Sequence, residues 1–262
     1  MLTTARVTKR DRFCAYERII LGLKWGKLSG KGRCRSEILI VRETKTVTLV
    51  GAGLATKAEI SRCMAISAAL IAADGGAAHC VEAGLMPDAV IGDMDSLDHI
   101  EALGIPKDSV HAIAEQDSTD FDKALRNIEA PLVLGAGFTG ARLDHQLAVY
   151  NVLVRRPDRQ CIILSDTDIA FLCPPVLRLP MSGGTRVSLY PMGLVEGTSH
   201  GLKWPINGLT FTPDGRVGTS NEATGDIEIT MTGPKMLVIL PKAELEKVAE
   251  ALLHSVARWP AL

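Results

Sequence analysis

The stretch Val47-Thr-Leu-Val-Gly-Ala-Gly53 begins the regular pattern of this 262-residue chain. Its first four residues form an apolar run that ends in Gly-Ala-Gly, and a helical pattern follows over residues 55–65. A buried strand that leads through a glycine turn into a helix is the opening unit of an α/β fold. The sequence therefore predicts that a Rossmann-like parallel sheet begins at residue 47.

Later segments repeat this pattern. Short apolar runs occur over residues 68–73, 88–91, 110–114 and 132–134. Helical patterns fall between or after them, over residues 77–83, 120–128 and 143–154. Short uninterrupted apolar runs are typical of parallel strands that are buried on both faces. Because ligands in open α/β sheets bind at the carboxyl ends of the strands, we expect the functional site there.

Four acidic motifs, each beside small residues, follow these runs. They are Ala73-Asp-Gly-Gly76, Gly92-Asp-Met-Asp-Ser96, Asp117-Ser-Thr-Asp-Phe-Asp-Lys123 and Arg142-Leu-Asp-His145. Carboxylates held close together repel each other unless a cation lies between them, and oxygen-only ligands favour a hard ion such as Mg²⁺. The motifs therefore indicate a metal site for nucleotide phosphate chemistry.

Asp93 and Asp95 are the strongest metal candidates, because residues two apart in an extended segment point to the same side. Asp120 completes the site if its helix begins at the same cleft, where the helix dipole also favours a bound anion. One alternative is a solvated loop in which Ser96 or Asp98 caps a helix. For Asp120 and Lys123, the alternative is a surface ion pair across one helical turn.

Arg142 and Asp144 open a helix after the loop 135–140. Backbone N–H groups, a guanidinium and a carboxylate can converge there on one phosphate group. A charge cluster without a ligand is the alternative. We expect His79 and His145 to be structural or solvent-facing, and neither is included in the predicted site.

The loop Gly135-Ala-Gly-Phe-Thr-Gly140 supports a competing interpretation, because it matches the dinucleotide fingerprint Gly-x-Gly-x-x-Gly. The acid that would bind the ribose is then Asp158, which lies in a Pro-Asp-Arg loop. No Gly-x-x-x-x-Gly-Lys-Ser/Thr sequence occurs, so an ordinary P-loop is excluded.

The sequence changes character at Pro174-Pro175 and Pro180, which places a domain boundary near residues 172–181. After it the sequence favours short strands separated by turns, over residues 186–190, 210–212, 227–231 and 237–240. A small antiparallel β-sandwich is the simplest arrangement of these strands. Residues 242–258 read as one amphipathic helix.

Three side chains of this second region could contact a ligand. Trp204 can stack on a flat or cationic molecule, although a tryptophan is by default a core residue. Ser220 and Asn221 are by default turn residues. The predicted organisation is an extension over residues 1–45, an α/β catalytic domain over 46–174 and a β-sandwich domain with a C-terminal helix over 175–262.

Residues 1–45 are basic, with 12 Lys or Arg against 4 Asp or Glu. We interpret them as a flexible extension or as the result of a start codon assigned too far upstream. The alternatives are a nucleic-acid or membrane arm or an organelle address. The whole chain has a formal charge of −1, which gives no general attraction to nucleic acid or anionic membranes.

The six cysteines include no Cys-x-x-Cys pair, so a disulfide framework or a zinc site is not expected. We interpret them as reduced thiols and predict a cytoplasmic protein. No apolar run reaches the roughly 18 residues that indicate a membrane span.

Taken in order, six motifs of this chain resemble the thiamine pyrophosphokinase family. They are Asp74-Gly-Gly76, Gly92-Asp-Met-Asp-Ser96, Gln116-Asp-Ser-Thr-Asp-Phe-Asp-Lys123, Gly140-Ala-Arg-Leu-Asp144, Gly201-Leu-Lys-Trp204 and Ser220-Asn221. The resemblance spans residues 47–241. It implies an α/β catalytic domain, a β-sandwich, a homodimer with active sites between subunits, and transfer of pyrophosphate from ATP to the hydroxyl of thiamine.

The resemblance also implies roles for individual residues. Mg²⁺ contacts fall to Asp93, Asp95 and Asp120. Active-site roles near the phosphates fall to Asp74, Arg142 and Asp144. ATP contacts fall to Gly75, Gly76, Lys123, Gly140 and Arg142. Thiamine contacts fall to Gln116, Trp204, Ser220 and Asn221, with the tryptophan reaching over from the partner subunit.

The sequence thus predicts a Mg²⁺-dependent thiamine pyrophosphokinase whose substrates are ATP and thiamine and which binds neither nucleic acid nor membrane. Mg²⁺ with Arg142 and Lys123 would stabilise the charge of the transferred group, and Asp74 or Asp120 would accept the hydroxyl proton. Two other functions stay open at this point. One is a nicotinamide-dependent oxidoreductase that uses the loop 135–140, and the other is a non-catalytic sensor of nucleotide or thiamine.

Overall fold

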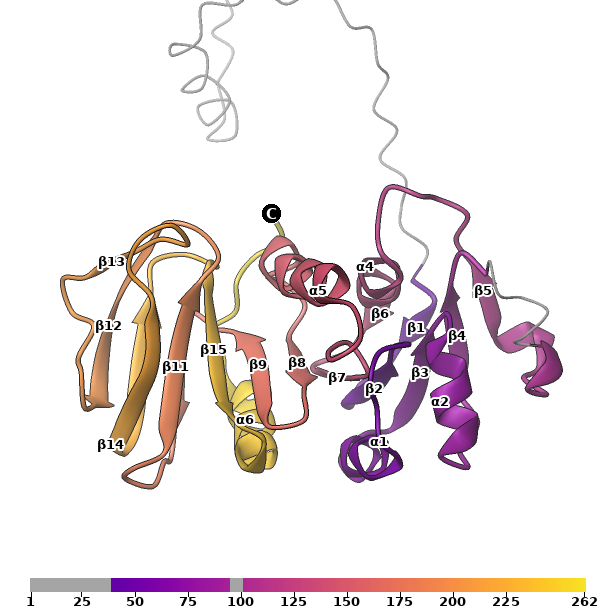
Figure 1. Cartoon of the computed structure of the whole chain (residues 1–262), viewed down its shortest axis with the longest axis horizontal. Helices are drawn as coiled ribbons and strands as arrows, with labels where there is room; N and C mark the ends of the chain where they lie inside the picture. The colour runs from indigo at the N-terminus through magenta and orange to yellow at the C-terminus, as the bar shows by residue number, and fades with distance from the viewer. Residues whose placement is uncertain (1–38, 95–100) are drawn as a thin grey trace, which may run out of the picture. The chain divides into compact units, whose positions relative to one another are not determined.

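The computed structural model of the chain describes residues 39–94 and 101–262 (Figure 1). These residues belong to one compact unit that spans residues 37–262. In this described part, 13 strands form one mixed sheet, in the order β13-β12-β14-β11-β15-β9-β8-β7-β2-β3-β4-β5, with β10 paired to β14. The predicted α/β class is therefore confirmed as a mixed α/β fold with a large mixed sheet.

Six strands of this sheet run parallel to one another. They are β2 (Val47–Val50), β3 (Ala69–Ala73), β4 (Ala89–Gly92), β5 (Val110–Ala112), β7 (Val133–Ala136) and β8 (Cys161–Leu164). The chain first adds strands on one side of β2, up to β5, and then returns to add β7 and β8 on the other side. The order therefore reverses between β2 and β7, and such a switch point is where open α/β sheets bind ligands.

The remaining strands of the sheet pair in antiparallel fashion. They are β9 (Asp168–Leu172), β10 (Val176–Leu179), β11 (Arg186–Pro191), β12 (Val195–Leu202), β13 (Thr210–Phe211), β14 (Gly218–Met231) and β15 (Met236–Pro241). Pairing passes without a break from β8 to β9, from β9 to β15 and from β15 to β11. The strands predicted for a separate sandwich thus continue the hydrogen bonding of the first sheet.

Strand β14 is much longer than the predicted segment 227–231. Its first residues pair with β11, and its last residues pair with both β10 and β12. Strand β12 was not predicted at all, because Gly197 and Gly201 interrupt its sequence. Gly201 has a φ of +78°, which only glycine adopts without strain.

A second, two-stranded parallel sheet joins β1 (Val41–Arg42) to β6 (Ile128–Glu129). Strand β1 lies inside the basic segment that was predicted as an extension. Residues 1–38 of that segment lie outside the described residues.

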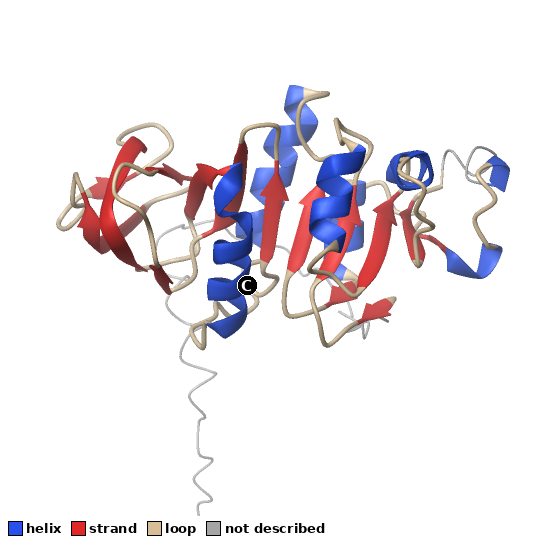
Figure 2. Cartoon of the chain, turned by 90° about the horizontal axis from the view of Figure 1, so that it is seen from below, coloured by secondary structure: helices blue, strands red, loops and turns tan. Residues whose placement is uncertain are grey.

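The helices cover both faces of the sheet (Figures 1 and 2). One apolar cluster contains buried residues of α1 (Lys57–Met64), α2 (Gly76–Glu82) and α6 (Leu245–His254). A second cluster contains those of α4 (Asp120–Arg126) and α5 (Leu143–Arg155). Neighbouring residues of β3 alternate between the two clusters, as expected for a strand buried on both faces.

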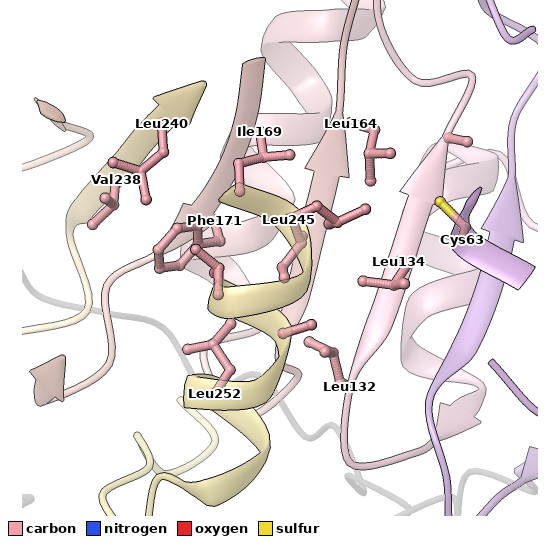
Figure 3. Close-up of a cluster of buried hydrophobic side chains, with 14 of the residues drawn as sticks. Cys63, Leu132, Leu134, Leu164, Ile169, Phe171, Val238, Leu240, Leu245 and Leu252 are labelled. Atoms are coloured by element: carbon pink, nitrogen blue, oxygen red, sulfur yellow. The ribbon is translucent and has the colours of Figure 1, made fainter. Parts of the chain in front are cut away.

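The C-terminal segment forms a shorter helix than predicted. A 3₁₀ turn, η3 (Lys242–Glu244), precedes α6, and the helix ends at His254. Figure 3 shows Leu245 and Leu252 of α6 beside Phe171 of β9. Beyond the helix, the indole N–H of Trp259 donates to the carbonyl of Cys173 at 2.8 Å, which holds the tail against the sheet.

Among residues 39–94 and 101–262, none of the helices combines the length and apolar character that crossing a bilayer requires. The four cysteines described there, Cys63, Cys80, Cys161 and Cys173, are all free and buried. Burial raises the pKa of the Cys63 and Cys80 thiols to about 12, so both are protonated and unreactive at neutral pH.

Candidate active site

Three predicted carboxylates meet at the carboxyl edge of the parallel strands. Asp74 follows β3, Asp93 follows β4, and Asp120 is the first residue of α4. One oxygen from each lies within 4.8 Å of the other two. The structure thus brings together residues from three separate motifs of the sequence. Of the three predicted metal ligands, Asp93 and Asp120 lie in this group, and Asp95 lies outside the described residues. Asp74, the third member of the group, is predicted as an active-site residue near the phosphates.

Lys123 provides a positive charge to this acid cluster, which we define as Asp74, Asp93 and Asp120. Its ammonium donates to Asp93 Oδ2 at 2.8 Å and to Asp120 Oδ1 at 3.1 Å. The alternative of an ion pair between Asp120 and Lys123 across one helical turn is therefore correct as to the pair. It is wrong as to a surface location of the lysine, whose side chain is only 1% exposed. Although burial acts to lower it, the hydrogen bonds that Lys123 donates to both carboxylates raise its pKa, so the residue is a cation at neutral pH.

The backbone around the acid cluster adopts uncommon conformations. Asp74 has a φ of +40° and Met94 a φ of +62°. The prediction of an extended segment over residues 93–95 is therefore wrong at Met94, where the chain turns and buries the methionine side chain. Gly92 lies so close to Asp74 that an added Cβ would stand 2.7 Å from the Asp74 Cβ. Left-handed conformations of non-glycine residues concentrate at functional sites.

A cavity of about 370 Å³ adjoins Asp74 and Asp120 at the switch point between β2 and β7. It is lined by Gly51, Ala52, Gly53, Ala73, Asp74, Gly75, Thr119, Asp120, Phe121, Gly137, Phe138, Thr139, Ala141, Arg142, His145 and Val149. Pockets of this size hold small ligands, and they often combine apolar walls with a few polar groups.

Two glycine loops form one wall of this cavity, and only glycine allows them to pack backbone against backbone. A Cβ on Gly51 would lie 2.6 Å from the Gly137 carbonyl oxygen. A Cβ on Gly137, whose φ is +75°, would lie 2.4 Å from the Gly51 carbonyl oxygen. Residues 137–139 of the loop that matches the dinucleotide fingerprint thus line the cavity, as do residues 51–53, which the sequence predicts only as the end of a strand.

Apolar side chains also line the cavity. The rings of Phe121 and Phe138 lie with centroids 4.7 Å apart, and Val149 of α5 adds to the same lining. His145, which was left out of the predicted site, also lines the cavity. Its position one residue after Asp144, in the first turn of α5, was the available signal.

Arg142 reaches the cavity from the N-cap position of α5, while Asp144 is not among the residues that line it. The two side chains form a forked ion pair, with Arg142 Nη2 2.6 Å from Asp144 Oδ2 and Arg142 Nε 3.2 Å from Oδ1. Asp144 raises the pKa of Arg142, and the guanidinium lowers the pKa of Asp144. Both side chains are exposed, so the guanidinium can exchange this partner for an anionic ligand.

The acid cluster also fits a divalent metal ion. Ligand atoms on opposite sides of an octahedral Mg²⁺ lie about 4 Å apart. The carboxylate oxygens of Asp74, Asp93 and Asp120 therefore need only small adjustments to share one ion. Three carboxylates and one ammonium leave two negative charges, which one divalent cation balances.

Comparison with known families shows which family the chain belongs to. Residues 61–164 match the family model described as "Thiamin pyrophosphokinase, catalytic domain". Residues 177–236 match the one described as "Thiamin pyrophosphokinase, vitamin B1 binding domain". The chain belongs to the thiamin pyrophosphokinase family.

Individual members of the thiamin pyrophosphokinase family are moderately similar to this chain. Thiamine pyrophosphokinase 1 of Arabidopsis thaliana is 32% identical in an alignment of 157 residues that covers 52% of this chain and 58% of that protein. Thiamine pyrophosphokinase of Bacillus subtilis is 29% identical in an alignment of 164 residues that covers 58% of this chain and 77% of that protein. The chain thus matches little more than half the length of the plant relatives.

Solved structures of thiamin pyrophosphokinases share the fold. The enzyme from Bacillus subtilis aligns with a TM-score of 0.62 at 22% identity, over 75% of this chain and 99% of that chain. The enzyme from Candida albicans aligns with a TM-score of 0.63 at 15% identity, over 77% of this chain and 93% of that chain. At these identities the likeness shows the fold alone.

Two residues of the C-terminal family motifs, Trp204 and Asn221, are joined by hydrogen bonds. Asn221 is buried, and its amide holds the backbone of Trp204, since Nδ2 donates to Trp204 O at 2.7 Å and Oδ1 accepts from Trp204 N at 3.1 Å. The Trp204 side chain is 56% exposed, so the alternative that it is a core residue is wrong. The Lys203 ammonium lies 5.0 Å from the centre of its ring.

Ser220 and Asn221 belong to strand β14, which corrects their default interpretation as turn residues. Ser220 has a φ of +60°, and its N–H donates to Ser188 Oγ at 3.0 Å. Gln116 is exposed on the loop before α4. None of the four predicted thiamine residues, Gln116, Trp204, Ser220 and Asn221, lines the cavity.

The glycines and the lysine predicted to contact ATP differ in position. Gly75 lines the cavity, whereas Gly76, Gly140 and Lys123 do not. Gly76 packs on β2, since an added Cβ would lie 2.1 Å from the carbonyl oxygen of Val50. Gly140 has a φ of +85°, which shapes the loop that leads to Arg142.

Proposed function

We propose that this chain is a thiamine pyrophosphokinase that transfers the pyrophosphoryl group of ATP to the hydroxyl of thiamine and releases AMP. One observation carries the proposal: carboxylates from β3, β4 and α4 meet beside a cavity at the switch point of the sheet. That arrangement occurs in a chain matched by both domain models of the family.

ATP would occupy the cavity between the two glycine loops. The loops at Gly51–Gly53 and Gly137–Gly140 allow the backbone to approach phosphates closely. The rings of Phe121 and Phe138 provide an apolar surface that suits a nucleobase. The exposed guanidinium of Arg142 would bind a phosphate in forked geometry.

Asp93 and Asp120, together with Asp74 or Asp95, would hold Mg²⁺. A bound Mg²⁺ supplies charge stabilisation to the phosphates and orients them for in-line attack. Lys123 keeps Asp93 and Asp120 in place through its two hydrogen bonds and reduces their mutual repulsion. We therefore assign Lys123 to the support of the acid cluster as well as to the predicted neighbourhood of ATP.

In the reaction, the thiamine hydroxyl oxygen would form a bond to the β-phosphorus of ATP. The bond from that phosphorus to the oxygen it shares with the α-phosphate would break, and AMP would leave with the electron pair. Asp74 or Asp120 would accept the hydroxyl proton. Arg142 would stabilise the negative charge that spreads over the transferred group.

Thiamine would be held by Gln116, Trp204, Ser220 and Asn221. Because these residues do not line the cavity of a single chain, we propose a homodimer in which Trp204 reaches the active site of the partner subunit. We further propose that residues 46–174 and 175–262 act as catalytic and thiamine-binding domains, and that the protein is cytoplasmic.

An assay with thiamine, ATP and MgCl₂, with products identified by mass, tests this proposal. We expect thiamine diphosphate and AMP in equal amounts, and no product after chelation with EDTA. ATP consumption without thiamine diphosphate would contradict the proposal. A binding protein without catalysis would give no AMP, and a nicotinamide-dependent enzyme would instead enhance NADH fluorescence on titration.

A further inference from the structure

The loop that leads into α4 is tied back to the end of that helix. Arg126, in the last turn of α4, donates from Nη2 to Glu115 Oε1 at 3.0 Å and from Nη1 to Ser118 Oγ at 3.4 Å. Ser118 Oγ also donates to the same Glu115 oxygen. These contacts join residues 115 and 118, so the two residues between them, Gln116 and Asp117, are carried on a closed loop.

The other end of the loop is also fixed. The N–H of Ile113 donates to the carbonyl of Gly92 at 2.7 Å, directly before Asp93 of the acid cluster. The loop ends at Thr119, whose hydroxyl caps α4 by accepting from the Asp122 N–H. The segment 113–119 therefore connects the backbone beside Asp93 to the first turn of the helix that begins with Asp120.

We call the contacts of Arg126 with Glu115 and Ser118 the tether. Arg126 lies beside a buried ion pair that joins α4 to α5. Asp122 of α4 is 1% exposed and accepts from Arg156 Nε at 2.8 Å and from Arg156 Nη2 at 3.2 Å, and Arg156 is the C-cap of α5. Arg126 Nη1 lies 3.9 Å from the same carboxylate. A half-buried arginine in such a network loses little side-chain freedom when it holds Glu115.

The charges of the tether are stable at neutral pH. The hydrogen bond from Ser118 lowers the pKa of Glu115, burial opposes this effect, and Arg126 lowers the pKa further. Glu115 is therefore an anion that keeps its charge-assisted bond to the guanidinium.

We propose that Arg126 is a positioning residue for the second substrate, because it holds Gln116 through Glu115 and Ser118 in the conformation that binds thiamine. The inference rests on the proposed function, in which Gln116 contacts thiamine. Neither Arg126 nor any of residues 115–118 lines the cavity proposed for ATP. Loss of Arg126 would loosen the loop while leaving the ATP cavity intact.

Steady-state kinetics of Arg126→Gln test this role. We expect the KM for thiamine to rise about tenfold, as for the loss of a charge-assisted contact, and the KM for ATP to change by less than about twofold. Arg126→Lys, which keeps the charge but not the fork, should lie between the variant and the wild type. The matched control is Arg178→Gln, which removes an arginine from an exposed pair with Glu228 and should leave both KM values unchanged.

Hydrogen exchange gives a second reading that does not depend on catalysis. In Arg126→Gln, amides of residues 115–118 should exchange faster than in the wild type, while those of β7 should not change. Unchanged exchange in the loop, or equal effects on both KM values, would overturn the inference. Failure of the wild type to form thiamine diphosphate would overturn the proposed function itself, and that result does not depend on Arg126.

Discussion

At the scale of single residues, charge decides how the acid cluster works. Lys123 offsets one of the three negative charges and bridges Asp93 and Asp120. The remaining charge is repulsive unless a cation binds. An anionic triphosphate would add to that repulsion, so substrate binding and metal binding should depend on each other.

Removing one carboxylate while keeping its shape tests this dependence. For Asp120→Asn we expect turnover to fall by about a hundredfold or more, because electrostatic stabilisation of the transferred group is lost. The Mg²⁺ concentration needed for half-maximal activity should rise. The fold should persist, since Asp120 is 37% exposed, and circular dichroism checks this. Asp95→Asn should give a similar loss, and near-normal activity in either folded variant would remove that residue from the metal site.

Gly92 controls the position of Asp74 without carrying any chemistry. In Gly92→Ala the new Cβ would stand 2.7 Å from the Asp74 Cβ, so one of the two strand ends must move. We expect turnover to fall about tenfold and the free energy of unfolding to fall by about 1–3 kcal/mol, as for overpacking. The control is Gly233→Ala, where no atom lies within 4 Å of the added Cβ. Equal effects of the two substitutions, measured by kinetics and thermal unfolding, would contradict this role.

At the scale of elements, the helix that follows the first glycine loop depends on its cap. Thr56 and Glu59 form a capping box at the start of α1, in which the Glu59 N–H donates to Thr56 Oγ1 at 3.2 Å and the Thr56 N–H donates to Glu59 Oε2 at 2.9 Å. Thr56→Ala should lower the free energy of unfolding by about 1 kcal/mol in denaturant titrations. Thr56→Ser keeps the hydroxyl and should remain close to the wild type. A loss in both variants would assign the effect to the threonine methyl group instead.

The elements also show what could be predicted from the sequence. The parallel strands and their helices follow from local signals, since Val47–Val50 is a short apolar run and α5 has a regular apolar stripe. Strand β12 has no apolar run, because its sequence Val-Glu-Gly-Thr-Ser-His-Gly-Leu is mostly polar and contains two glycines. Its position depends on pairing with β14. Local periodicity cannot show pairing between distant strands.

Some features of the candidate site could likewise be predicted from the sequence, and others could not. Asp74, Asp93 and Asp120 could be grouped from the sequence, because the carboxyl ends of parallel strands meet at one edge. Lys123 could be placed on the same helix as Asp120, but its burial depends on how α4 packs against β4 and could not be predicted. The loop Gly51–Gly53 was missed as part of the cavity, because its contact with Gly137 joins segments more than eighty residues apart in the sequence.

At the scale of the whole molecule, the C-terminal helix links the last part of the sequence to the first helix of the sheet. Arg62 of α1 forms a forked pair with Glu246 of α6, at 2.7 Å from Nε and 2.6 Å from Nη2. Lys242 of η3 donates to Glu59 Oε1 of α1 at 2.8 Å. Together with the apolar face of α6, these two pairs fix α6 on the face of the sheet that α1 also covers (Figure 1).

These pairs should make stability depend on pH in the acidic range. The hydrogen bond from Arg62 lowers the pKa of Glu246. Burial acts to raise the pKa of Glu59, but hydrogen bonds from Lys242 and Thr56 together lower it below its usual value. A carboxylate with a lowered pKa in the folded state stabilises the fold above its unfolded pKa near 4.5, and this contribution is lost as the pH falls through the folded value.

The double variant Glu59→Gln/Glu246→Gln tests this link between α1 and the C-terminal segment. At pH 7 we expect it to be less stable than the wild type by about 1 kcal/mol, or about 2–4 °C in melting temperature, because partly exposed pairs contribute little each. Between pH 6 and pH 3.5 the melting temperature of the wild type should fall further than that of the variant, so the two curves should converge at acidic pH. Parallel curves would show that the carboxylates are not the groups that titrate. The control is Arg178→Gln, which breaks an ion pair between β10 and β14. Its melting temperature should depend on pH as that of the wild type does, which would locate the effect at the contact between α1 and the C-terminal segment.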